Sequence, residues 1–211
     1  MRDAPEHLYL SWDCREVRVV NNHFAYGQNT GIILDGTAQH VIANNTIEGF
    51  RVGIEARGMS EIKPRDRCRD IALTSNYVHA DIGIRLSGEC RGFAITGNDF
   101  INNTEAAVLI VDSGGAGKHS ITGNVVRKSV YGGDFFPLPN SSPLQGGIYL
   151  GDAADCLVSS NLLEGINPGP ALSAGPGGGG HIITGNRILS GEGQGIDLSA
   201  AKCLVENNLC T

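Results

Sequence analysis

Charged residues recur at two alternate positions of a repeated Gly-Ile-x-Leu phrase. Glu55 and Arg85 occupy the x position of two successive phrases, while Asp35 and Arg57 lie two residues beyond that position. If the phrases are strands that stack in parallel, Glu55 faces Arg85, and Asp35 faces Arg57, at about 5 Å. Two interpretations stay open. Each pair is a solvated ion pair that contributes roughly 0 to 1 kcal/mol, or the four side chains form a charged floor for an anion such as a sugar acid.

The second interpretation gives these side chains catalytic roles. Arg85 would be the anchor or the base, and Glu55 or Asp35 the acid, the base or a metal ligand. The diagonal from Asp35 to Glu55 is expected to be roughly 7 to 8 Å, which suits two carboxylates that leave room for a water molecule, as in inverting glycosidases. Calcium takes six to eight oxygen ligands, whereas the neighbouring positions supply mainly arginines, so neither a metal site nor a cofactor is predicted.

An Asn returns along the chain with similar apolar neighbours, three residues before it and two after it. The shortest spacing is 22 residues, from Asn76 to Asn98. Short Ile- and Val-rich segments at this spacing predict three strands per repeat, each stacked about 4.8 Å from the next repeat. Stacked repeats would also align the Asn side chains into an amide ladder. The repeated residues are Asn22, Asn45, Asn76, Asn98, Asn124, Asn161, Asn186 and Asn208.

This pattern resembles the right-handed parallel β-helix family, the pectin-lyase-like superfamily. The resemblance is carried by the Ile-Thr-Gly-Asn phrases at 121–124 and 183–186 and by the Gly-Ile-x-Leu phrases, and it spans nearly the whole chain. It implies that Gly-Ile-x-Leu is the first strand of each coil and that the Asn sits in a tight turn between the second and third strands.

The expected fold is therefore all-β. It is a single-stranded right-handed parallel β-helix, or β-solenoid, of about eight coils, with three parallel sheets and an Asn ladder in a tight turn. The range 1–211 is expected to form a single domain that is open at both ends, because no amphipathic helix is present to cap them. Raw strand edges are normally covered, so open ends favour a homo-oligomer or a longer solenoid.

Four segments exceed the minimal repeat and are expected to leave the solenoid as loops, at 57–69, 112–118, 128–145 and 167–180. They adjoin the first-strand sheet, and the resembled superfamily's enzymes hold their substrate in a groove along that sheet. The loop at 57–69 has five basic and two acidic residues, on a chain whose net charge is −6. It is either a solvated loop with internal ion pairs or a basic wall for carboxylate, sulfate or phosphate.

Aromatic residues are expected on the opposite wall, where Tyr131 and Phe135 either bind a sugar or fold back as a lid. Tyr149 and Asp197 share the outward column of Glu55 and Arg85. The catalytic candidates are Arg85, Glu55 and Asp35. The substrate-binding candidates are Tyr149, Arg57, Arg65, Arg67, Tyr131, Phe135 and Asp197.

The composition disfavours some classes of binding partner. An acidic chain is a poor general surface for nucleic acid or anionic membranes, and no run of 18 apolar residues predicts a membrane span. No signal peptide is recognised in the given chain, so the compartment stays open.

His40, His119 and His181 fall in an inward column on separated coils and are interpreted as structural. Cys68 and Cys90 lie on adjacent coils, where a disulfide or a ladder of thiols fits equally well.

The predicted function is the binding or processing of a carbohydrate, an anionic polysaccharide, in the first-strand groove, with lyase-, glycosidase- or epimerase-like activity if it is an enzyme. The signature runs of polygalacturonases, pectate lyases and alginate epimerases are absent from the sequence. The alternative is a non-catalytic β-helix scaffold, or a segment of a surface, adhesion or phage-fibre protein.

Overall fold

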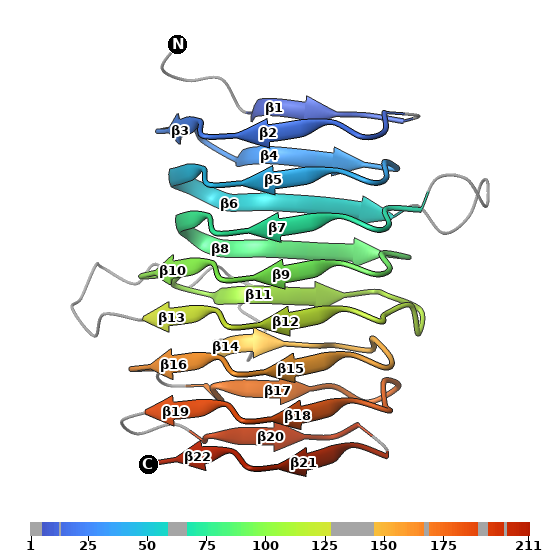
Figure 1. The fold of residues 1–211 in the computed structure, drawn as a ribbon, viewed down its shortest axis with the longest axis vertical. Helices are drawn as coiled ribbons and strands as arrows, with labels where there is room; N and C mark the ends of the chain where they lie inside the picture. The colour runs from blue at the N-terminus through green and yellow to red at the C-terminus, as the bar shows by residue number, and fades with distance from the viewer. Residues whose placement is uncertain are drawn as a thin grey trace.

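The computed structural model describes residues 6–12, 14–58, 67–127, 146–166, 169–189, 194–200 and 202–211. In these residues, short parallel strands wind into a column, and each strand pairs with the equivalent strand of the neighbouring coil (Figure 1). The first-strand stack contains β1 (Glu6–Leu10), β4 (Thr30–Asp35), β6 (Thr46–Gly58), β8 (Tyr77–Gly88), β11 (Ala106–Val111), β14 (Gly146–Tyr149), β17 (Leu172–Ala174) and β20 (Ile196–Leu198).

Two further stacks complete each coil. The second-strand stack contains β2 (Arg18–Val20), β5 (Val41–Ala43), β7 (Ala72–Thr74), β9 (Ala94–Thr96), β12 (Ser120–Thr122), β15 (Leu157–Ser159), β18 (Ile182–Thr184) and β21 (Leu204–Glu206). The third-strand stack contains β3 (His23–Ala25), the first residues of β6 and β8, β10 (Asp99–Ile101), β13 (Val125–Arg127), β16 (Leu162–Glu164), β19 (Arg187–Leu189) and β22 (Leu209–Cys210).

The first-strand and third-strand stacks are joined into one 14-stranded sheet because β6 and β8 run without a break from one stack into the other. The second-strand stack is a separate sheet of 8 strands. Eight strands in that stack correspond to eight coils, so the all-β solenoid expected from the Asn repeat is confirmed.

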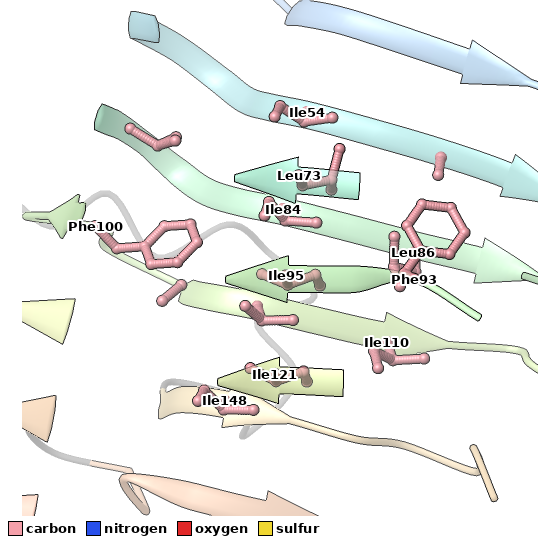
Figure 2. Packing of buried hydrophobic residues seen from close by; sticks show 14 of the residues in the cluster. Ile54, Leu73, Ile84, Leu86, Phe93, Ile95, Phe100, Ile110, Ile121 and Ile148 are labelled. Atoms are coloured by element: carbon pink, nitrogen blue, oxygen red, sulfur yellow. The ribbon is translucent and has the colours of Figure 1, made fainter. Parts of the chain in front are cut away.

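The core is a set of apolar ladders inside the coils (Figure 2). Ile54, Ile84 and Ile148 come from the first-strand stack, and Ile95 and Ile121 from the second; all five are at most 1% exposed. The strands of the inner coils contribute alternate side chains to this interior, because side chains on a strand point to opposite faces in turn. Branched side chains at the inward positions therefore fix which residues must point outward.

An unbroken Asn ladder runs along the turn between the second and third strands. In each coil the backbone N–H and the side-chain amide of the Asn donate to Oδ1 of the Asn in the next coil, as from Asn76 to Asn98 at 2.9 and 3.0 Å. The chain runs from Asn22 to Asn208 through every repeat predicted from the sequence. The residue before each Asn has a left-handed φ, for example 54° at Ser75 and 57° at Ser160.

The four segments predicted to be loops differ in how far the observed structure agrees with the prediction. The range 112–118 is a turn, in which Ser113 and Gly114 donate backbone hydrogen bonds to the carboxylate of Asp152. The loop expected at 167–180 is wrong in part, because β17 lies within it and pairs with β14 and β20. Residues 57 and 58 belong to β6. The ranges 59–66 and 128–145 lie outside the described residues.

Candidate functional site

One outward column of the first-strand stack contains the catalytic candidates Glu55 and Arg85. The observed register pairs Glu55 with Ile33 on one side and with Arg85 on the other. The column continues through Leu109 and Tyr149, and then through Ser173 to Asp197. We call the outward surface formed by this column, together with Thr30, Asp35, Arg57 and Ser87 beside it, the first-strand face.

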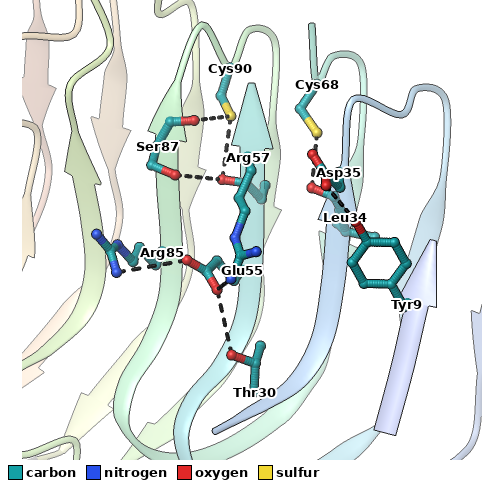
Figure 3. A network of polar contacts seen from close by, with 11 residues as sticks. Tyr9, Thr30, Leu34, Asp35, Glu55, Arg57, Cys68, Arg85, Ser87 and Cys90 are labelled. Carbon is teal, nitrogen blue, oxygen red and sulfur yellow. Dashed lines mark hydrogen bonds and ion pairs between the residues drawn. The ribbon is translucent and has the colours of Figure 1, made fainter. Parts of the chain in front are cut away.

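Glu55 is the centre of a polar network on this face (Figure 3). It is only 6% exposed. Arg57 Nη2 donates to Glu55 Oε2 at 2.6 Å, Arg85 Nη1 lies 3.7 Å from Oε1, and Thr30 Oγ1 donates to Oε2 at 3.5 Å. The hydrogen bond to Glu55 raises the pKa of the Arg57 guanidinium. The buried carboxylate thus lies between two guanidinium groups, and the pair Glu55–Arg85 expected from the sequence is present.

The expected ion pair between Asp35 and Arg57 is wrong. The two residues are in register, but Arg57 extends along its own strand to Glu55, and no ion pair joins it to Asp35 among the described residues. Residues two apart on a strand share a face, so the long Arg57 side chain can reach either acid. It donates to Glu55, the more deeply buried of the two carboxylates.

Asp35 is bound instead by Tyr9 of β1. The Tyr9 hydroxyl donates to Asp35 Oδ2 at 2.5 Å, and this hydrogen bond, with burial and the charge of Asp35, raises the pKa of the phenol. Asp35 is 9% exposed, whereas Tyr9 is 46% exposed. Sequence reasoning gave Tyr9 no role; the signal that could have identified it is a Tyr on the strand next to an outward Asp.

The first-strand face carries both charged and apolar side chains. Asp35, Glu55, Arg57 and Arg85 lie on β4, β6 and β8, while Val52 of β6, Ile82 of β8, and Ala106 and Leu109 of β11 form a small apolar cluster against which Tyr149 of β14 packs. Asp197 is exposed on β20, four strands from Arg85 and therefore roughly 19 Å away. The structure thus brings Asp35, Glu55, Arg57 and Arg85 together and leaves Asp197 apart from them.

The predicted basic wall is only partly described. Arg67 forms an ion pair with Glu89, and Arg69 lies 3.8 Å from Asp70. Those two arginines therefore have acidic partners within the protein. Arg65, Tyr131 and Phe135 lie outside the described residues, so their predicted roles stay predictions.

The inward histidines make backbone contacts. His40 Nδ1 accepts the Val17 N–H at 3.0 Å, and His119 and His181 accept the N–H groups of Phe93 and Cys156, each at 3.3 Å. Burial lowers the pKa of all three imidazoles, that of His119 to about 4. Their geometry agrees with the structural interpretation.

Cys68 and Cys90 are free thiols stacked on adjacent coils. The Cys68 thiol donates to Leu34 O at 3.2 Å, and that of Cys90 to Ser87 O at 3.4 Å. The neighbouring Cys68 and burial raise the pKa of the Cys90 thiol.

Within the described residues, no three His, Cys, Asp or Glu side chains come together as a metal site. The same part of the chain has no helix long and apolar enough to span a membrane.

Comparisons with known proteins agree with this architecture. The family model described as a right handed beta helix region matches residues 7–136. A search of the curated proteins finds no match. Among solved structures, the chain is similar to a mutant of the periplasmic alginate epimerase AlgG, with a TM-score of 0.75 and 14% sequence identity. The alignment covers 98% of this chain and 48% of that one, so the chain spans about half the length of this structural neighbour.

Proposed function

We propose, from the premise that this chain belongs to the right-handed β-helix family, that it binds an anionic polysaccharide on the first-strand face. The observation that carries the proposal is the arrangement around Glu55. Arg85 lies beside this buried carboxylate at 3.7 Å, while its Nε is buried and receives no partner from the described residues. An arginine side chain that is 39% exposed and has an uncommitted Nε donor is suited to a carboxylate or sulfate group.

Polysaccharide processing is the class of activity that the structural neighbour suggests, since that protein is an alginate epimerase. For this chain we propose that Arg85 anchors the acidic group and that Glu55 and Asp35 are the candidate acid and base. The reaction would be lyase-, glycosidase- or epimerase-like. Tyr149, on the apolar part of the face, would contact the sugar ring.

The second candidate function is a non-catalytic scaffold. It is favoured by the ion pairs themselves, because Arg57 and Arg67 are bound by Glu55 and Glu89. On this view the charges of the first-strand face stabilise the stacking of β4, β6 and β8, and no ligand is involved.

A binding experiment separates the two candidates. We expect isothermal titration calorimetry to detect a uronic-acid or sulfated polysaccharide but not a neutral one. Arg85→Ala is expected to weaken this binding about 10- to 100-fold, the usual range for one charged hydrogen bond. Arg187→Ala, which removes an exposed arginine from the third-strand stack, is the matched control and should bind as the unmodified protein does. Equal binding by both variants would exclude Arg85 from the contact with the polysaccharide, and no binding by the unmodified protein would favour the scaffold.

A further inference from the structure

Two buried polar atoms of the first-strand face have no partner among the described residues. They are the acceptor Asp35 Oδ1 and the donor Arg85 Nε. More than nine-tenths of Asp35 is buried. Buried polar groups are nearly always hydrogen-bonded, because leaving one unpaired costs about 1 to 3 kcal/mol. An unpaired acceptor and an unpaired donor on the same face therefore indicate groups that a ligand would satisfy.

Tyr9 fixes the geometry at Asp35. Its hydroxyl is committed to Oδ2, so the second carboxylate oxygen remains to accept a hydrogen bond. The raised pKa of Tyr9 keeps the phenol neutral and donating. Because Tyr9 is 46% exposed, its ring also presents an apolar surface beside this acceptor. An acceptor next to an aromatic ring matches a sugar unit, whose hydroxyl donates while its C–H face contacts the ring.

Charge decides which sugar unit fits each position. The carboxylate of Asp35 repels an acidic unit and accepts from a hydroxyl, whereas Arg85 attracts an acidic unit. Asp35 lies on β4 and Arg85 on β8, with β6 between them, so the two positions are roughly 10 Å apart along the solenoid. A uniformly acidic polymer would place a negative group against Asp35.

We propose that Tyr9 and Asp35 form a subsite for an uncharged, hydroxyl-bearing sugar unit. The ligand is then a mixed polysaccharide in which a neutral unit lies close to the acidic unit bound by Arg85. This inference rests on the proposed function, since it places a second subsite on the same face.

The test compares two polymers of equal length by isothermal titration calorimetry. One carries a single glucuronic acid in each repeat of four sugar units, so that a neutral unit lies two units away from the acidic one, and the other is polyglucuronic acid. We expect the protein to bind the mixed polymer more tightly. Tyr9→Ala should weaken binding of the mixed polymer about 10-fold and leave the binding of polyglucuronic acid unchanged. Asp35→Asn preserves the shape of the side chain but removes its charge. It should reduce the difference in affinity between the two polymers, because polyglucuronic acid would bind more tightly.

Tyr77→Ala is the matched control for Tyr9→Ala and should bind both polymers as the unmodified protein does. Tyr77 is 37% exposed, but it lies at the start of β8, in the third-strand stack. Equal binding of the two polymers, with no effect of Tyr9→Ala and a retained effect of Arg85→Ala, would overturn the neutral subsite and leave the proposed function standing. If the unmodified protein binds neither these polymers nor any other acidic or sulfated polysaccharide, the proposed function fails and the subsite fails with it.

Discussion

At the residue scale, the charge of Glu55 contributes to folding as well as to the proposed site. Glu55→Gln keeps the shape of the side chain but removes the negative charge that Arg57 and Arg85 contact. Because both arginine side chains are 39 to 44% exposed, water screens part of the loss. We expect the free energy of unfolding in urea to fall by about 1 to 2 kcal/mol.

The control for this change is Glu164→Gln, which removes an ion pair with Arg127 whose side chains are 37% and 50% exposed. That substitution is expected to cost less than about 1 kcal/mol. An equal loss of unfolding free energy in the two variants would show that the burial of Glu55 does not increase the stability that its ion pairs contribute.

His119 gives the protein a pH dependence. Its folded pKa, about 4, lies below the ordinary 6.5, so the unfolded chain binds the proton more readily. The stability contributed by neutral His119 is complete above pH 6.5 and is lost as the pH falls towards 4. The full loss is roughly 3 kcal/mol. In urea unfolding at pH 7.5 and 4.5, His119→Gln should lose less stability between the two pH values than the unmodified protein.

The control here is His23→Gln, because His23 is exposed and contacts Glu48. It should show the same loss as the unmodified protein between pH 7.5 and 4.5. A loss in His119→Gln as large as in the unmodified protein would mean that another group carries the acid sensitivity.

At the element scale, the turn with the Asn ladder holds successive coils in register. Asn98 donates to Leu73 O and Asn124 Oδ1, and accepts two hydrogen bonds from Asn76. Asn98→Ala would leave several buried groups unpaired, so we expect a loss of about 2 to 4 kcal/mol. Asn22→Ala, at the exposed first position of the ladder, should cost under about 1 kcal/mol. Thermal unfolding followed by circular dichroism would compare them, and similar melting temperatures would contradict this role.

The register of the elements could be predicted from the sequence, but the partners of their side chains could not. The period of two and the recurring Gly-Ile-x-Leu phrase place Glu55 opposite Arg85, since a shift by one residue would expose Ile54 and Ile84. Arg57 could reach either Asp35 or Glu55, and only burial in three dimensions decides between them. β17 was missed because small residues and glycines surround it, without the Gly-Ile-x-Leu phrase.

At the scale of the whole molecule, stability is expected to decrease towards the last described coil. Val205 is 44% exposed, whereas Ile95 and Ile121 at the equivalent position of inner coils are fully buried. Stacked repeats contact only their neighbours, so a coil with one neighbour opens more readily than a coil with two. Hydrogen exchange followed by mass spectrometry should show faster exchange in β21 and β22 than in β9 and β12. Uniform protection would mean that the solenoid opens as one unit.

The contact of each coil with only its neighbours also bears on how such a protein can evolve. Duplication or deletion of one complete coil, joined at the left-handed residue before the ladder Asn, would leave the bonds of the other coils unchanged. The distance between Tyr9 and Arg85 could thus grow or shrink in steps of about 4.8 Å. Gain or loss of whole coils would then match the spacing of the two proposed subsites to polymers with different repeating units, without the need for a new core.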